Sequence, residues 1–505
     1  MSRTEPDRAQ TAVKGGATAI LTKGIGRLGL RLARGFLIYL LANFGIKALN
    51  FFLVPLYTRF LSPADYGIVS VAETVAAVLM AVLGLGLDAG VCRLYFQYVG
   101  DPARLEACIS SLLRFAVMST VLAVSVVLLL GQRLQTWAIP HFSVLFYPYI
   151  AMAITTGALL QIVQYRLSLY QVQERASTFG LFAIGVFLTT AAAVIVLVVF
   201  VRWGAFGMLL GKLFAAALAT IGAIYLLRAW LGAPFEWKFV RETLPFSLPL
   251  VPHQLMALFL VAADRLILAH YRSLQEVGLY SLAYTLGMAM FLVALSVGQA
   301  WQPIYFDTAR SNGGRHTLGN LSSSMAILLT AIAIFGIQIA GYFTRLLDSQ
   351  YFPVGRLVPW IIGSYLLHAF FGLFQLALLE AKKTKFILFA SAAAFSLNLA
   401  LNLWWIPLLG MYGAAYATLV AYGAEALVMY FYAQRVFFLP YDWRGMFVAL
   451  VLLATALGLS QFNWKGYVHI LMTLGMLLST AIMVWFFGRK IAGQILKLAL
   501  NGKTS

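Results

Sequence analysis

Charged residues are scarce in this sequence. Of its 505 residues, 10% are Asp, Glu, Lys or Arg, 62% are hydrophobic, and the mean hydropathy is +0.87. A soluble globular chain carries about 25% charged residues. This shortage of charge excludes a soluble protein and predicts a polytopic membrane protein of the all-α class.

Acidic residues are rarer than basic ones, with 17 Asp and Glu against 36 Lys and Arg, and the formal net charge is +19. This excess does not predict a nucleic-acid partner, because Lys and Arg gather on alternate connections between apolar runs. Cysteine is almost missing, and Cys92 and Cys108 are predicted to be reduced structural thiols. The six His are scattered, so no metal site is expected.

Several catalytic signatures are also missing. No GxxxxGK[ST] phosphate-binding loop occurs, so the chain carries no nucleotide-driven motor of its own. No connection is long enough to fold the aqueous domain that a glycosyltransferase or polymerase needs. Transport is therefore favoured over enzymatic activity, and no cofactor is expected.

Long apolar runs are abundant. A helix needs about 20 apolar residues to cross a bilayer, and we count about fourteen such runs. Their centres lie near Asn43, Val78, Ala123, Met152, Val186, Ala216, Leu258, Met290, Ile332, Leu367, Phe395, Tyr422, Val451 and Met476.

Basic residues give these runs a direction in the membrane. One set of connections carries few cations, namely Arg59, Arg133, Arg202, Arg272, Arg345, Arg356 and Lys465. The other connections and both terminal segments carry most of the rest. The positive-inside rule therefore places both termini in the cytoplasm, on the inner side of a bacterial cytoplasmic membrane. The basic, amphipathic segment 1–35 suits a helix lying on an anionic leaflet, or equally a plain positive-inside anchor.

Two short motifs occur twice, in the same order. Residues 65–72 read DYGIVSVA and residues 276–283 read EVGLYSLA, with an acid, Gly, Ser and Ala at matching positions. The segments 204–207 (GAFG) and 410–413 (GMYG) repeat at nearly the same spacing, each at the head of an apolar run. These repeats predict two homologous lobes, which in membrane proteins usually enclose a path between them.

Ionisable residues inside the apolar runs point to a cavity or to buried pairs, because each costs several kcal/mol at the bilayer centre. Lys47 shares a helical face with Asn43 and Asn50, and either faces a cavity or pairs with Glu73. Lys212 has Thr418 as its counterpart in the second repeat, so this cation belongs to one lobe only.

Two further carboxylates lie inside apolar runs. Asp264 and Arg265 either form a structural pair near the interface or serve transport. Glu425 shares a face with Thr418 and Tyr422, and if it is buried it is protonated or paired. Neutral polar residues recur in other runs and are expected to bond between helices or to line the path: Gln161, Gln164, Gln254, His368, Gln375, Asn398 and Asn402.

Residues 54–73 read VPLYTRFLSPADYGIVSVAE, and residues 85–96 read LGLDAGVCRLYF. Together with the segments around Asp264-Arg265 and Val277-Gly278, they resemble the polysaccharide biosynthesis (oligosaccharide flippase) family of the multidrug/oligosaccharidyl-lipid/polysaccharide (MOP) exporter superfamily. The resemblance extends in outline from residue 36 to about residue 435.

The resemblance implies two pseudo-symmetric six-helix lobes plus two extra helices. We expect a basic cytoplasmic segment at 1–35, an N-terminal lobe at 36–228, a linker at 229–244 and a C-terminal lobe at 245–436. The last two spans would occupy 437–489, and a basic cytoplasmic tail 490–505. The resemblance also implies alternating access of a central cavity, with a lipid-diphosphate-linked oligosaccharide as cargo.

A cavity biased toward cations suits a diphosphate, because Lys and Arg satisfy phosphate oxygens that apolar surroundings cannot. The diphosphate candidates are Lys47, Lys212, Arg265, Arg59 and Arg93. The glycan candidates are Asn43, Asn50, Gln161, Gln164, Gln254, His368, Gln375, Asn398 and Asn402. Coupling to H⁺ or Na⁺ would use Glu73, Asp264 or Glu425, although a downhill cycle needs no ion site.

Two other functions stay open. A cation-coupled multidrug exporter of the same superfamily shares this topology, but Lys47 would repel a cationic drug. A non-transporting scaffold of a polysaccharide assembly complex would tolerate loss of Lys47 and Arg265. Membrane lipids are expected partners, together with a polysaccharide polymerase or other assembly enzymes.

Overall fold

The structure is a computed structural model, and it describes residues 45–47, 49–138, 143–309, 314–462 and 470–486. Nearly all of the described residues are helical, and no strand occurs among them. The longer elements in chain order are α2 (Pro63–Leu83), α3 (Leu87–Tyr98), α4 (Pro102–Ala138), α5 (Ala151–Val172), α6 (Ala176–Ile195), α7 (Gly204–Leu227), α8 (Trp237–Ser247), α9 (Leu250–Tyr271), α10 (Leu274–Ala309), α11 (Gly314–Phe343), α12 (Val354–Glu380), α13 (Lys385–Leu409), α14 (Met411–Val436) and α15 (Trp443–Leu459).

The predicted spans correspond to these helices. Within the described ranges, ten helices are long and apolar enough to cross a membrane, and α9 adds a span bent by 49°. Two shorter apolar helices follow, Trp443–Leu459 and Ile470–Phe486. The first predicted run, centred near Asn43, lies largely outside the described residues, which include helix over 49–58. The prediction of an all-α polytopic membrane protein is confirmed.

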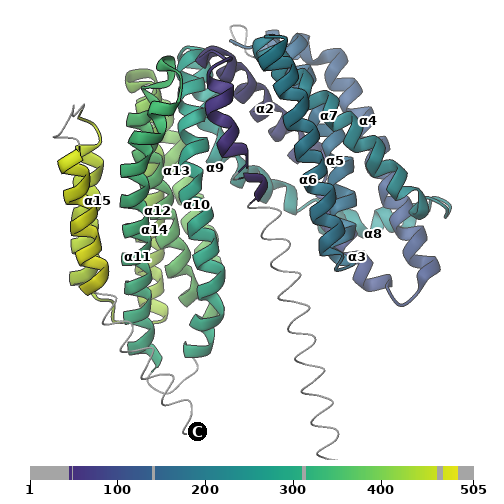
Figure 1. The fold of residues 1–505 in the computed structure, drawn as a ribbon. Coiled ribbons are helices and arrows are strands. Elements are labelled where there is room, and N and C mark those ends of the chain that lie inside the picture. The colour runs from purple at the N-terminus through teal and green to yellow at the C-terminus, as the bar shows by residue number, and fades with distance from the viewer. Residues whose placement is uncertain (1–44, 48, 139–142, 310–313, 463–469, 487–505) are drawn as a thin grey trace, which may run out of the picture.

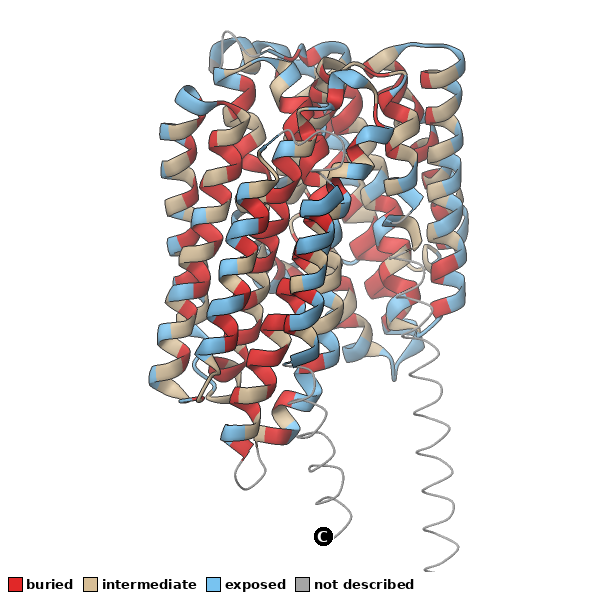
Figure 2. Ribbon diagram, turned by 60° about the vertical axis from the view of Figure 1, so that its left-hand side comes forward, coloured by how far each residue is buried: buried red, intermediate tan, exposed pale blue. Residues whose placement is uncertain are grey.

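The helices form two bundles. In Figure 1, α3 to α8 gather on the right and α10 to α15 on the left, and the bundles approach each other at the upper end. Figure 2 shows that buried residues lie mainly where helices face one another and exposed ones on the outside. The connections at the upper end are those that the charge pattern assigns to the outer side of the membrane.

The repeated motifs meet where the bundles meet. Gly67 on α2 faces Gly278 on α10, and a Cβ atom on either would overlap backbone atoms of the other helix. One turn along, the Ser70 and Ser281 hydroxyls lie 2.6 Å apart, and these two residues are 211 positions apart in the chain. Small residues allow helix backbones to approach closely, so each copy of the motif packs on the other.

The acid of each motif binds the second repeated segment. Asp65 Oδ1 accepts a hydrogen bond from the Ala205 N–H at 3.2 Å, and Glu276 Oε2 accepts one from the Met411 N–H at 3.0 Å. Each carboxylate therefore lies at a helix N-terminus, α7 or α14, where unsatisfied N–H groups favour negative charge. Gly204 and Gly410 precede these donors with φ of 54° and 59°, a region that favours glycine.

The predicted linker, residues 229–244, contains most of α8. This helix packs on the N-terminal bundle, where Gln97 Nε2 and the Tyr98 hydroxyl donate to the Glu242 carboxylate at 2.8 and 2.9 Å. Upstream of α8, the Ser110 hydroxyl on α4 donates to the Ala233 carbonyl at 2.9 Å. The connection between the bundles is thus anchored to the first of them.

Candidate functional site

A cavity of about 280 Å³ lies beside the crossing of α2 and α10, and helices α7 and α9 complete its wall. The paired hydroxyls of Ser70 and Ser281 line it, together with Tyr66 and Thr285. The cavity therefore lies at the junction of the two bundles, directly beside the contact between the repeated motifs.

Three ionisable side chains line this cavity. Lys212 on α7 donates a hydrogen bond to Glu73 on α2 and forms an ion pair with it. Arg265 enters from α9, where its Nη1 donates to the Val261 carbonyl at 3.2 Å and its guanidinium lies 4.9 Å from the Tyr284 ring centre. Two cations and one carboxylate leave this cavity with a positive balance.

Asp264 and Arg265 attract each other electrostatically, but they are not in ion-pair contact. Its carboxylate is 2% exposed, receives a hydrogen bond from the Tyr280 hydroxyl, and accepts the Arg265 backbone N–H at 2.8 Å. Among the described side chains, no ion pair joins Asp264 to the Arg265 guanidinium. Asp264 is thus part of the core of the C-terminal bundle, and Arg265 lines the cavity.

A second cavity of about 350 Å³ adjoins the first, since Tyr66, Met208, Lys212 and Thr285 line both. Asn50 lines this second cavity from the helix over 49–58, although its Nδ2 donates to the Ile46 carbonyl at 3.1 Å. The structure thus brings together Lys212, Arg265, Glu73 and Asn50 out of the residues predicted from sequence.

Three predicted diphosphate ligands lie elsewhere. Lys47 is exposed and does not pair with Glu73, which pairs with Lys212 instead. Arg59 is exposed beyond the end of its helix. Arg93 on α3 lies over the Phe246 ring at 4.6 Å. Asn43, a glycan candidate on the same predicted face as Lys47, lies outside the described residues.

The predicted glycan residues divide into separate groups. Gln161 packs against Gly84, and Gln164, on the same helix, is exposed. Gln254 is half-buried near the start of α9. Asn398 and Asn402 are buried on α13, where Asn402 Nδ2 donates to Asn398 Oδ1 at 2.9 Å. None of these five residues lines either cavity beside Lys212.

His368 and Glu425 form a pair within the C-terminal bundle. The Glu425 carboxylate is 1% exposed, lies 3.0 Å from His368 Nδ1, and accepts the Ser391 hydroxyl at 2.9 Å. His368 and Gln375 also line a third cavity of about 220 Å³ between α10 and α12. Glu425 is therefore a buried carboxylate next to a residue that lines a cavity.

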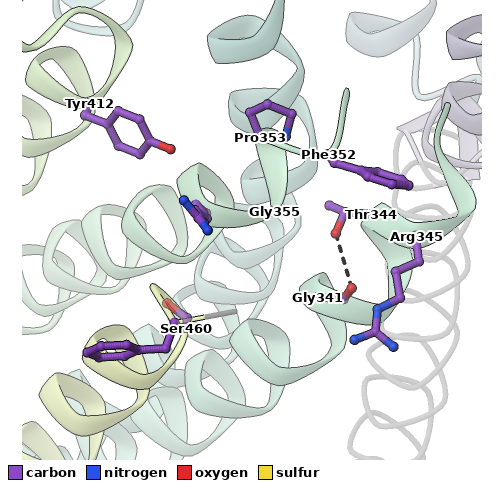
Figure 3. A pocket seen from close by; sticks show the side chains of 10 residues that line it. Gly341, Thr344, Arg345, Phe352, Pro353, Gly355, Tyr412 and Ser460 are labelled. Carbon is purple, nitrogen blue, oxygen red and sulfur yellow. Dashed lines mark hydrogen bonds between the residues drawn. The ribbon is translucent and has the colours of Figure 1, made fainter. Parts of the chain in front are cut away.

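The largest of the cavities described here lies at the other end of the C-terminal bundle. It measures about 550 Å³, and Figure 3 shows Thr344, Arg345, Phe352 and Tyr412 among the side chains around it. None of the site residues predicted from sequence lines it. Within the described part of the chain, no group of three or more His, Cys, Asp or Glu side chains is placed to hold a metal ion.

Sequence reasoning missed the neutral part of the cavity beside Lys212. Tyr66, Thr285 and the Ser70–Ser281 pair were not predicted as site residues, although both serines occupy matching positions of the repeated motif. The repeat itself is the signal that could have found the serine pair, since segments that meet on a pseudo-two-fold axis contact their own copies.

A family model described as "Polysaccharide biosynthesis protein" matches residues 32–309, more than half of the chain. The chain belongs to this polysaccharide biosynthesis protein family. The family resemblance seen in residues 54–73 and 85–96 is confirmed. No curated protein sequence matches this family member significantly.

Solved structures share the fold. "Lipid II flippase MurJ, inward closed conformation" superposes with a TM-score of 0.67 at 14% identity, covering 91% of this chain and 100% of that one. An inward-facing multidrug resistance MATE family transporter of the MOP superfamily gives 0.55 at 13% identity, covering 76% and 94%. A MOP superfamily transporter from Pyrococcus furiosus gives 0.51 at 13% identity, covering 79% and 93%.

These similarities place the family member in the MOP transporter fold. Sequence identities of 13–14% support a shared fold, and neither a substrate nor a residue role follows from them. The sequence prediction of a transporter rather than an enzyme agrees with both the family and the fold.

Proposed function

We propose that this protein is a flippase that moves a polyprenyl-diphosphate-linked oligosaccharide from the cytoplasmic to the outer leaflet by alternating access. The observation that carries the proposal is that Lys212 and Arg265 line one cavity between the bundles. Cations in apolar surroundings are costly unless an anion compensates them. A diphosphate compensates them through charge-assisted hydrogen bonds, which are the stronger kind.

Glu73 is a resident anion that the substrate would replace. Glu73 forms an ion pair with Lys212 in this structure. The Glu73 side chain is 46% exposed, and the Lys212 side chain is 24% exposed. A diphosphate that enters the cavity offers Lys212 more acceptor oxygens than one carboxylate does. Glu73 would then be released from its partner, which gives substrate binding a route to alter the α2–α7 contact.

The contacts between the bundles suit a state that is closed on the predicted outer side. There the Tyr351 hydroxyl donates to the Leu61 carbonyl at 3.0 Å, and the Ser143 hydroxyl donates to the Ala269 carbonyl at 2.8 Å. We propose that rocking of the lobes breaks these bonds together with the Ser70–Ser281 contact. Lipid-linked substrate would load from the cytoplasmic side, where the two termini are proposed to lie.

The remaining assignments are proposals of the same kind. The lobes would span 36–228 and 245–436, with the last two helices, 437–489, beside the second lobe, in a bacterial cytoplasmic membrane. Assembly enzymes such as a polymerase would receive the product. Resetting of the lobes would use H⁺ or Na⁺ at Glu73, Asp264 or Glu425. Amide variants of all three that keep gradient-dependent flipping would contradict ion coupling at these carboxylates.

Flipping in proteoliposomes tests the function. Wild-type protein, Lys212→Ala and Arg265→Ala would be reconstituted with a polyprenyl-diphosphate oligosaccharide, after folded protein has been verified by size-exclusion chromatography. We expect wild type to move the lipid and both variants to lose at least about 90% of the rate, since each removes a charge-assisted bond worth about 1.5–3 kcal/mol. Arg175→Ala, which removes an exposed cation on a connection, is the matched control.

The runner-up function is export of cationic drugs. Glu73 is the carboxylate that would attract such a drug, but Lys212 pairs with it and Arg265 lies in the same cavity. Wild type that extrudes organic cations and leaves every lipid-linked glycan unflipped would overturn the flippase proposal. Unchanged flipping by Lys212→Ala and Arg265→Ala would show that these two cations do not bind the diphosphate.

A further inference from the structure

The third cavity, of about 220 Å³, differs in its chemistry from the two cavities beside Lys212. It is lined from α10 by Phe291, Gln299, Trp301 and Gln302, and from α12 by His368, Phe371 and Gln375. Among the described residues, no Asp, Glu, Lys or Arg lines it. A ligand of this cavity is therefore uncharged where it makes contact.

The polar groups of this cavity suit a ligand rich in hydroxyls. Each of the three glutamine amides offers two N–H donors and one carbonyl acceptor, so each both donates to and accepts from hydroxyl groups. Gln299 and Gln302 lie one turn apart on α10, and both are exposed. Polar side chains of membrane-crossing helices face a partner or a hydrated cavity rather than lipid.

Trp301 provides a separate observation. Its side chain is 2% exposed, and its indole Nε1–H has no hydrogen-bond partner among the described residues. A buried indole N–H ordinarily has an acceptor. Trp301 also lines the cavity, and a ligand hydroxyl oxygen that reached Nε1 would satisfy this donor.

Aromatic rings supply the apolar part of the wall. The His368 and Phe371 rings are stacked, with centroids 5.5 Å apart and 15° between their planes, and Phe291 lies 6.3 Å from His368. Flat rings beside amides complement a pyranose, which carries C–H groups on its faces and hydroxyls around its edge. His368 Nδ1 is taken by Glu425, so only its other ring nitrogen is available to a ligand.

The position of the cavity matches the direction in which a glycan would extend. Thr285 lines the cationic cavity, and the α10 residues of the third cavity lie six to seventeen positions further along. At 1.5 Å per residue this is roughly 9–25 Å along the helix axis. The direction is toward the cytoplasmic end of α10, on which side the sugar of an unflipped lipid lies.

We propose that this cavity is a neutral-sugar subsite, which binds a pyranose of the oligosaccharide while Lys212 and Arg265 hold its diphosphate. The inference rests on the proposed function for the identity of the cargo. Its volume lies below the roughly 300–1,000 Å³ of drug-sized ligand sites. The subsite would therefore bind only part of the oligosaccharide and would be selective for the configuration of that part.

Binding of bare and glycosylated lipids to the full-length protein in nanodiscs tests the subsite. The probes are undecaprenyl diphosphate and the same lipid carrying neutral tetrasaccharides of gluco, galacto or manno configuration. We expect the best glycan to tighten binding to wild type, and Trp301→Phe and Gln375→Leu each to reduce this gain about three- to tenfold, the effect of one lost hydrogen bond. Affinity for the bare diphosphate lipid stays unchanged in both. Gln338→Leu, which removes an amide outside this cavity, is the matched control.

The outcomes separate this proposal from the proposed function. If every lipid binds wild type without a gain from sugar, or if Trp301→Phe and Gln375→Leu weaken bare and glycosylated lipid equally, the subsite is overturned while the diphosphate site stands. If neither bare nor glycosylated undecaprenyl diphosphate binds, the proposed function falls. The free tetrasaccharides, followed by saturation-transfer NMR, then decide the subsite: a signal lost in Trp301→Phe supports it, and no signal overturns it.

Discussion

Lys212 and Glu73 share one ion pair but have different expected roles, and substitutions separate them. Lys212→Met leaves the Glu73 carboxylate without its cation, whereas the double variant Lys212→Met/Glu73→Gln removes both charges. We expect the double variant to recover the melting temperature that the single variant loses. Flipping stays lost in both, because the phosphate ligand is missing from both.

Thermal melting and proteoliposome flipping measure these two effects on the same preparations. Glu73→Gln alone is the informative control, since it leaves Lys212 free for substrate and is expected to keep downhill flipping. Recovery of flipping by the double variant would mean that Lys212 serves only to neutralise Glu73.

Glu425 is the most enclosed of the three carboxylates proposed for ion coupling. It is 1% exposed and bonded to Ser391 and His368. Glu425→Gln keeps the shape and one acceptor but removes the ability to change charge. We expect stable protein whose flipping rate no longer responds to an imposed proton gradient, measured in the proteoliposome assay. Asp264→Asn is the comparison, and a full gradient response in Glu425→Gln would exclude Glu425 as the proton carrier.

Sequence reasoning recovers charged site residues better than neutral ones. Lys212 and Arg265 stand out because a charge in an apolar run has few structural explanations. Pairing of Lys47 with Glu73 was one of two alternatives and does not occur, because spacing along one helix defines a face and leaves the facing helix unknown. Ser70, Ser281 and Trp301 carry no such signal, since serine and tryptophan are ordinary residues in spanning helices.

At the scale of elements, the close crossing of α2 and α10 depends on Gly67 and Gly278, which have no side chains. A Cβ atom at Gly278 would overlap backbone of α2, whereas one at Gly185 on α6 would meet nothing within 4 Å. We expect Gly278→Ala to lower the melting temperature by several degrees or to abolish folded protein. Gly185→Ala should be neutral or stabilising by up to about 1 kcal/mol, because alanine favours helix.

Fluorescence-monitored melting of purified protein in detergent checks this pair. Equal stability of the two variants would show that α2 and α10 have room to separate without loss. Gly67→Ala, the repeat counterpart of Gly278→Ala, should show a similar loss.

The elements themselves follow closely from the apolar runs. Thirteen of the predicted centres fall on described helices, because one hydrophobic stretch of sufficient length has only the helix as a spanning form. The helices α3 and α8 were not predicted as elements, since neither is long and apolar enough to cross a membrane. Helix α3 packs on α4 and α5, and α8 packs on α3 and α4, and no local pattern in the sequence records these contacts.

At the scale of the whole molecule, alternating access requires the two bundles to part at the outer side. The Ser70 and Ser281 hydroxyls are 2.6 Å apart, so cysteines at both positions would lie within reach of a disulfide. In a background lacking Cys92 and Cys108, we expect oxidised Ser70→Cys/Ser281→Cys protein to stop flipping and a reductant to restore it. Flipping assays with and without reductant provide the measurement.

The single cysteine variants are the controls, since they carry the same side chains without the bridge. Continued flipping by fully oxidised protein would mean that α2 and α10 stay together throughout the cycle. The outer path would then open between other helices.

The two repeated motifs predicted two lobes, but the sequence did not say where the lobes meet or which polar residues share a cavity. Both depend on how helices far apart in the chain pack, and periodicity within one helix does not encode this. Arg59 and Arg93 were predicted as diphosphate ligands on charge alone, and both are exposed and lie outside the cavity that Lys212 and Arg265 line.

The contact of Ser70 with Ser281 is a residue touching its own copy, as happens on the two-fold axis of a homodimer. A half-length ancestor would have formed this contact between two separate subunits, together with the facing glycines. Lys212 has Thr418 as its counterpart, so the charge of the cavity breaks that symmetry. Fusion of two such halves would have a chemical consequence: once they are joined, one half can acquire a cation while its twin stays neutral.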